Sequence, residues 1–157
     1  ELEALARCHD ERVRLNPGAR IMVETMKAHG ARCVLVSGGF TDFTDRVAEA
    51  AGFQAARANV LERSDGRLTG RVREPILGRE AKLAALRHEA AQLGVGLDAT
   101  LAVGDGANDL AMIEAAGLGV AYRAKPVVAA RADARVDVAD LTALLYFQGY
   151  RREEFAQ

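Results

Sequence analysis

Two carboxylates in a glycine-rich turn form the segment of this chain best suited to chemistry. Asp105 and Asp109 stand in the stretch GDGAND at 104–109, directly after the apolar run 100–103. Ligands of open parallel α/β sheets bind beyond the carboxyl ends of the strands. Carboxylate oxygens are the ligands that Mg²⁺ prefers. The spacing therefore predicts a metal-binding turn between a buried strand and a helix over 110–115.

The same turn argues against dinucleotide binding. A dinucleotide loop needs the pattern G-x-G-x-x-G, and Asp109 occupies the third glycine position here. Two negative charges would also repel a pyrophosphate unless a cation lay between them. Because acids at the mouth of a strand are costly unless they are paired or bound to metal, we expect a functional role for Asp105, Asn108 and Asp109.

Two further positions could bind an anion. Ser37-Gly38-Gly39 follows the apolar run 33–36, and a turn of this composition can direct backbone N–H groups and a hydroxyl at a phosphate. Lys82 lies near the start of a predicted helix and is a good partner for phosphate. Taken alone, these residues also fit a simple turn and a solvated lysine. The serine is not in a nucleophile elbow, because Leu35 stands where G-x-S-x-G needs its first glycine.

Short apolar runs alternate with amphipathic segments, which predicts an α/β fold with a mostly parallel sheet and right-handed crossovers. Asp65-Gly66 between two strand-like runs predicts a β-hairpin. Thr41 or Asp42 is expected to cap the third helix. The expected helices are 1–15, 17–28, 41–51, 78–93, 110–115, 125–131 and 141–147, and the expected strands are 33–36, 55–61, 68–72, 100–103, 118–121 and 135–138. Ile21, Met22, Val23 and Met26 are expected to face the core, as are Leu83, Leu86, Ala90 and Leu93.

Composition narrows the function classes. The 157 residues, with 50% apolar and 27% charged side chains, fit one ordinary domain. A net charge of −1 with scattered basic residues gives no support to nucleic-acid binding. No apolar run approaches the length of a membrane span. Two cysteines make no disulfide framework, so we expect a cytoplasmic protein with Cys33 in the core. The three histidines are scattered, so they make no zinc site, and we expect them at the surface.

In this order, the three sites resemble those of the haloacid-dehalogenase-like phosphatases, and most closely the phosphoserine phosphatases among them. The likeness is carried by LVSGGFT at 35–41, VGDGANDLAM at 103–112 and DLTALLYFQGY at 140–150. It implies a Rossmann-like core, a Mg²⁺ cofactor and hydrolysis of L-phosphoserine to serine and phosphate, a step of serine biosynthesis. The resemblance further implies an aspartyl-phosphate, formed by covalent catalysis.

The resemblance also assigns roles by position. Ser37 and Gly38 would hold the phosphoryl oxygens, and Asn108 would contact the substrate or its phosphate. Lys82 would neutralise charge on the phosphate and on the nucleophile. Asp105 would ligate Mg²⁺, and Asp109 would support the metal from its shell, so that Lys82 and Asp109 are the expected catalytic residues.

The chain departs from the family at the nucleophile. The family places it in a D-x-D-x-T motif after a first, central strand, and the chain contains no Asp-x-Asp. We therefore expect that this strand, lying between the strands 33–36 and 100–103, and most of the helical cap are absent. Residues 1–15 would then be the end of the cap or a linker helix, and 16–157 an incomplete core. The place of the absent strand would be filled by a missing N-terminal part, by another chain or by a rearrangement of this chain.

Three interpretations follow. The chain is the C-terminal portion of a phosphoserine phosphatase, inactive alone, or of a related phosphatase with another small phosphomonoester as substrate. Alternatively, it is a non-catalytic phosphate- or metal-binding module that lost its nucleophile. The third interpretation, a complete enzyme with Ser37 as nucleophile, is disfavoured because no histidine has a motif-level link to that serine.

Overall fold

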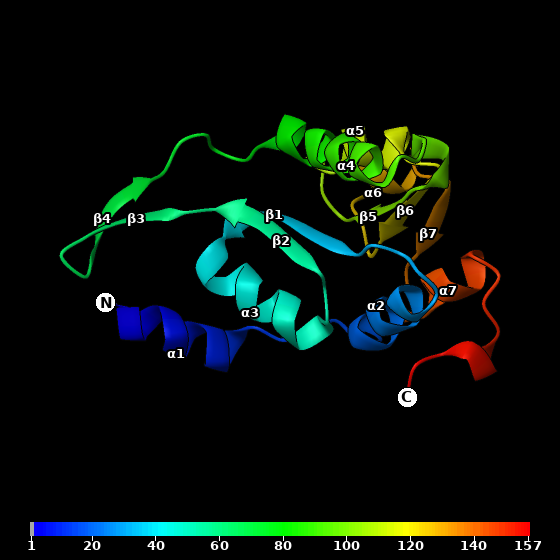
Figure 1. Cartoon of the computed structure of the whole chain (residues 1–157), viewed down its shortest axis with the longest axis horizontal. Helices are drawn as coiled ribbons and strands as arrows, with labels where there is room; N and C mark the ends of the chain where they lie inside the picture. The colour runs from blue at the N-terminus through cyan, green and yellow to red at the C-terminus, as the bar shows by residue number, and fades with distance from the viewer. Residues whose placement is uncertain (1) are drawn as a thin grey trace. The chain divides into compact units, whose positions relative to one another are not determined.

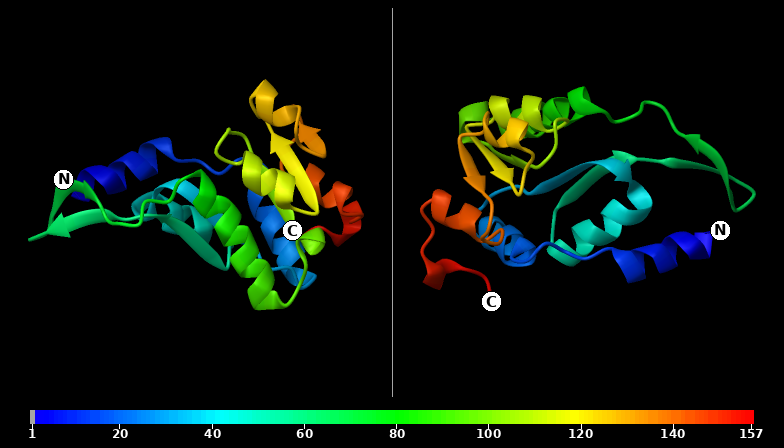
Figure 2. Two further views of the ribbon diagram at one scale, coloured as in Figure 1. Left: turned by 90° about the horizontal axis from the view of Figure 1, so that it is seen from above. Right: turned by 180° about the vertical axis from the view of Figure 1, so that it is seen from behind.

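The computed structural model describes residues 2–157 (Figures 1 and 2). It divides the chain into two compact units. Unit 1 comprises the chain up to Ile76 together with 140–157, and unit 2 comprises 77–139. None of the described helices is long and apolar enough to cross a membrane.

Unit 1 contains two small sheets and the helices around them. Strands β1 and β2 pair in parallel, and β3 and β4 pair antiparallel. Its elements are α1 (Leu2–Arg12), α2 (Ala19–Ala28), β1 (Val34–Phe40), α3 (Thr41–Ala51), β2 (Ala55–Asn59), β3 (Leu61–Ser64), β4 (Arg67–Val72), α7 (Ala143–Phe147) and a short 3-10 helix, η2 (Arg152–Glu154).

Strand β1 is longer than predicted. Ser37-Gly38-Gly39 was expected to be a turn after the strand, but β1 continues through it to Phe40. The register with β2 shifts between Val36 and Phe40, so the serine and glycines form an irregular part of the strand. The expectation of a strand buried on both faces is also wrong, because Val34–Val36 are only half-buried between β2 and α3.

The predicted hairpin is confirmed. Asp65 and Gly66 connect β3 to β4 with φ angles of 50° and 75°, the two positive values that a tight two-residue hairpin turn requires. The first strand of the hairpin is β3, since Ser64 pairs directly with Arg67, whereas most of the predicted strand 55–61 is β2 and pairs with β1 instead. The Asp-Gly pair therefore sets the register of the hairpin.

Helix α2 buries a narrower face than predicted. Met22 and Val23 are buried as expected, whereas Ile21 is exposed. The predicted cap of α3 is wrong, because the N-cap residue is Phe40 and Thr41 is already helical. The Thr44 hydroxyl instead donates a hydrogen bond to the Phe40 carbonyl one turn back.

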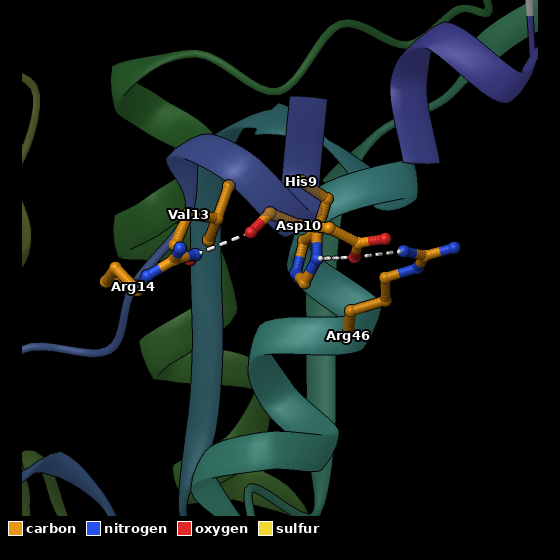
Figure 3. A network of polar contacts seen from close by, with 5 residues as sticks. All are labelled: His9, Asp10, Val13, Arg14 and Arg46. Atoms are coloured by element: carbon orange, nitrogen blue, oxygen red, sulfur yellow. Dashed lines mark hydrogen bonds and ion pairs between the residues drawn. The ribbon is translucent and has the colours of Figure 1, made fainter. Parts of the chain in front are cut away.

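A small polar network joins α1 to α3 (Figure 3). The Asp10 carboxylate lies 3.2 Å from His9 Nδ1 and accepts a 3.2 Å hydrogen bond from Arg46. The expectation that His9 is a surface residue is wrong, because its ring is mostly covered and Nε2 is buried without a partner in the described chain. Since Asp10 and Arg46 are both exposed, their ion pair contributes little stability.

Unit 2 is a three-stranded parallel sheet with helices. The strand order is β5-β6-β7, and the pairing between β5 and β6 runs without a break from Leu101↔Leu118 to Gly104↔Ala121. The elements are α4 (Arg79–Leu93), a 3-10 turn η1 (Leu97–Ala99), β5 (Leu101–Gly104), α5 (Leu110–Ala115), β6 (Leu118–Tyr122), α6 (Pro126–Ala129) and β7 (Ala134–Val136). The predicted strand–turn–helix around the Asp105 turn is therefore confirmed.

The core of unit 2 lies between its sheet and helices. Leu110, Ile113, Ala121 and Val128 form a buried cluster. On α4 the buried residues are Ala85 and Ala90, and the prediction that Leu93 faces inward is wrong because it is 54% exposed. The exposed leucine occupies the last position of the helix, next to the left-handed Gly94 that ends it.

Gly119 of β6 packs closely against Ile113 of α5. A Cβ added there would lie 2.2 Å from the Ile113 carbonyl oxygen and 2.8 Å from the Ile113 side chain. We expect Gly119→Ala to lower the free energy of unfolding by about 1–3 kcal/mol through overpacking. Urea denaturation should show this shift, whereas Gly78→Ala, where a Cβ meets open space, should cost only the preference of a helix N-cap for glycine over alanine, below about 1 kcal/mol. Equal effects of the two substitutions would contradict the tight contact.

Candidate functional site

Asp109 organises the turn after β5. Its side chain is almost fully buried, and Oδ2 accepts hydrogen bonds from the backbone N–H groups of Asp105 at 3.1 Å and Gly106 at 3.0 Å. Oδ1 accepts a 2.5 Å hydrogen bond from Lys82 Nζ. The carboxylate therefore ties the turn to helix α4 and has each oxygen engaged.

The glycines of the motif permit this close approach. A Cβ at Gly104 would lie 2.4 Å from both Cβ and Cγ of Asp109. A Cβ at Gly106 would lie 2.6 Å from the Asn108 amide oxygen. The Asp109 N–H also donates to the Gly106 carbonyl at 2.9 Å, which closes the turn. Glycine at both positions lets Asp109 fold back over its own loop.

Lys82 is not a solvated surface lysine. Its side chain is 11% exposed, and it projects from the first turns of α4 to the buried Asp109. A buried ammonium needs a partner, and Asp109 supplies it. An ammonium has three N–H donors, so Lys82 can donate to a bound anion while it keeps this ion pair. The sequence prediction that Lys82 and Asp109 act together is consistent with this geometry.

Asp105 and Asn108 present polar groups at the surface of the same turn. Both are exposed, and the Asp105 carboxylate has no hydrogen-bond or ion-pair partner within residues 2–157. It is therefore free to ligate a cation. No group of three or more His, Cys, Asp or Glu side chains suited to a metal occurs among the described residues. Asp105 can thus supply one ligand, and the rest of a coordination sphere must come from water, substrate or residues beyond this turn.

Ser37 and Gly38 belong to unit 1. Ser37 is half-buried, and its hydroxyl oxygen accepts a 3.0 Å hydrogen bond from the Gly39 N–H. The Gly38 carbonyl accepts a 2.9 Å hydrogen bond from the Asn59 amide. Gly38 and Gly39 are exposed, so the segment is accessible to an anion. The expectation that it lies at one edge with Lys82 stays a prediction.

Comparisons with known proteins give a consistent result. The profile of the haloacid dehalogenase-like hydrolase family matches residues 1–114. A phosphoserine phosphatase of Streptomyces coelicolor is 53% identical over 142 residues, which cover 90% of this chain and 35% of that protein. The crystal structure of a phosphoserine phosphatase in apo form superposes with a TM-score of 0.86 at 36% identity, covering 93% of this chain and 72% of that one.

A second solved structure bears on the chemistry. It is described as a phospho-aspartyl intermediate analogue of phosphoserine phosphatase, and it superposes with a TM-score of 0.85 at 36% identity. The match covers 93% of this chain and 69% of that chain. This chain thus spans about a third of the Streptomyces relative and about two thirds of the two solved structures.

Proposed function

The chain belongs to the haloacid dehalogenase-like hydrolase family, and from this we propose that it carries the phosphate- and metal-binding part of a phosphoserine phosphatase. The α/β fold with mostly parallel strands fits this assignment. The observation that carries the proposal is the buried ion pair of Lys82 with Asp109, at the carboxyl end of a parallel strand.

Lys82 is proposed to stabilise the transferring phosphoryl group. Its charge is preorganised by Asp109, in a position that is only 11% exposed to water. Fixed charges in such surroundings stabilise developing negative charge without a reorganisation cost during the reaction. Asp109 acts by holding Lys82 and the backbone of the turn in place, and Asn108 is proposed to contact the substrate from the same turn.

A divalent cation fits the exposed face of the turn. Asp105 offers an unpaired carboxylate, and the Asp105 and Gly106 N–H groups donate to Asp109 and therefore do not occupy that carboxylate. We propose that Asp105 would hold Mg²⁺. When bound, the ion would supply Lewis-acid polarisation of the phosphoryl oxygens and orient the substrate.

The remaining roles are proposed from the resemblance of the motifs. Ser37 and Gly38 are proposed to bind phosphoryl oxygens, and the nucleophilic aspartate is proposed to lie outside the printed residues. Residues 1–15 would be the end of a cap or linker helix, and 16–157 the incomplete core. The substrate is proposed to be L-phosphoserine, and the setting cytoplasmic serine biosynthesis. The chain is not expected to bind nucleic acid or membrane.

A non-catalytic binding module is the second candidate, since the chain has no Asp-x-Asp and the described residues offer no group of three metal ligands. An assay of the full-length protein with L-phosphoserine separates the two functions. We expect Mg²⁺-dependent release of phosphate from the full-length protein and none from residues 1–157 alone, because no D-x-D-x-T motif occurs in them. Preference for another small phosphomonoester would correct the substrate. Absence of turnover with every phosphomonoester would leave the binding module.

A further inference from the structure

Two cationic side chains follow β6 at the same edge of the sheet as the Asp105 turn. β5 and β6 are parallel and in register up to Gly104↔Ala121, so the residues after each strand are neighbours. Arg123 and Lys125 stand one and three residues beyond the end of β6 and are exposed. The Lys125 N–H donates a 3.1 Å hydrogen bond to the Asp105 carbonyl, which joins the two loops directly.

Arg123 is held in an unusual backbone conformation. Its φ is 46°, a left-handed value that otherwise occurs, among non-glycine residues of the described chain, only at the hairpin residue Asp65. The Arg123 N–H donates a 2.8 Å hydrogen bond to the Val136 carbonyl of β7, which fixes this geometry. Strained backbone of this kind is uncommon and concentrates at binding sites. The guanidinium lies 5.2 Å from the centroid of the buried Tyr122 ring, which orients it.

Neither cation is neutralised locally. Within residues 2–157, Arg123 and Lys125 have no ion-pair partner, unlike Arg131 and Arg135, which pair with Glu114 and Asp137. The Asp105 turn and Lys82 together carry one net negative charge, from two carboxylates and one ammonium. A phosphate dianion would be repelled by that turn in the absence of a cation. Arg123 and Lys125 reverse the sign of this charge before Mg²⁺ binds, and they add two positive charges to it once Asp105 holds the ion.

We propose that Arg123 and Lys125 form an anion-receiving element that attracts a phosphate dianion to the Asp105 turn. This inference rests on the proposed function and adds to it the residues that set the electrostatic field of the site. The anion is a phosphate monoester when the substrate arrives and inorganic phosphate when the product leaves. The backbone hydrogen bond between Lys125 and Asp105 holds the two loops side by side, so a ligand at the Asp105 turn lies in the electrostatic field of both loops.

The test uses the full-length protein with Mg²⁺ and the double variant Arg123→Gln/Lys125→Gln. Electrostatic steering changes association rates by 10–10³-fold, so at low salt we expect about tenfold weaker binding of inorganic phosphate and about tenfold lower kcat/KM. Both differences should shrink as salt is raised. A fall in kcat/KM with unchanged kcat would show that Arg123 and Lys125 act on the arriving substrate. Weaker inhibition by phosphate with an altered kcat would show that they act on the departing product. The variant Arg123→Lys/Lys125→Arg should retain wild-type behaviour.

Arg87→Gln is the matched control. Arg87 is exposed on α4, five residues beyond Lys82 and therefore about 7.5 Å further along the helix axis, toward the opposite edge of the sheet. If the double variant matched this control in both phosphate binding and kcat/KM, the proposal would be overturned. If the full-length protein hydrolysed no phosphomonoester, the proposed function would fail, and the phosphate-binding comparison would still decide whether the pair receives anions.

Discussion

Replacing Lys82 by methionine is expected to lower the turnover of the full-length protein by about 10²–10³-fold, equivalent to about 2.7–4 kcal/mol of transition-state stabilisation. Methionine keeps much of the length of the side chain and removes the charge that faces Asp109. The loss should fall mainly on kcat, because the charge is needed most where negative charge develops. Steady-state kinetics with L-phosphoserine and Mg²⁺ measure it.

The control for this substitution is Arg87→Met, which removes a cation from the exposed side of the same helix. It should leave kcat within about twofold of wild type, because exposed charges contribute little through solvent. Circular dichroism should show that the Lys82 variant is folded under assay conditions. Wild-type kcat in a folded Lys82→Met protein would remove this lysine from the site.

The second large effect is expected on stability. Asp109→Ala leaves Lys82 buried without its counterion and removes the acceptor of the Asp105 and Gly106 N–H groups. Breaking a buried ion pair by removing one partner costs about 3–5 kcal/mol. Urea denaturation should therefore show a much lower free energy of unfolding, together with loss of any turnover.

Glu114→Gln provides the matched comparison for the lost carboxylate. Glu114 pairs with Arg131, and both side chains are about a third or more exposed, so its loss should cost less than about 1 kcal/mol. The double variant Lys82→Met/Asp109→Ala should be less destabilised than the sum of the two single changes, because no charge is left buried alone. Additive losses would show that the two groups are not coupled.

The sequence predicted the elements of unit 2 well because strong local signals coincide there. The apolar run before Gly104 and the helix from Leu110 lie as expected on either side of the turn. The hairpin was equally clear, because Asp65-Gly66 is a strong local signal. Glycine spacing and β-branched runs are local properties, so one sequence suffices to find them.

Features set by packing were harder to predict. The continuation of β1 through Ser37-Gly38-Gly39 depends on pairing with β2, and two glycines gave no sign of it. The burial of Lys82 depends on Asp109, 27 residues away, and only the resemblance linked the two. Arg123 and Lys125 were missed because they carry no motif. Only their position in the sequence could have indicated them, because they directly follow a buried strand that lies parallel to the strand before Asp105.

We propose that this chain positions a phosphoryl group for transfer to an aspartate outside residues 1–157. The most direct measurement is acid quenching of the full-length protein during turnover with ³²P-labelled phosphoserine, followed by peptide mapping of the label. We expect an acid-stable, base-labile acyl phosphate on an aspartate of a D-x-D-x-T motif, with none on residues 1–157. Label on Ser37, or turnover without any covalent label, would contradict it.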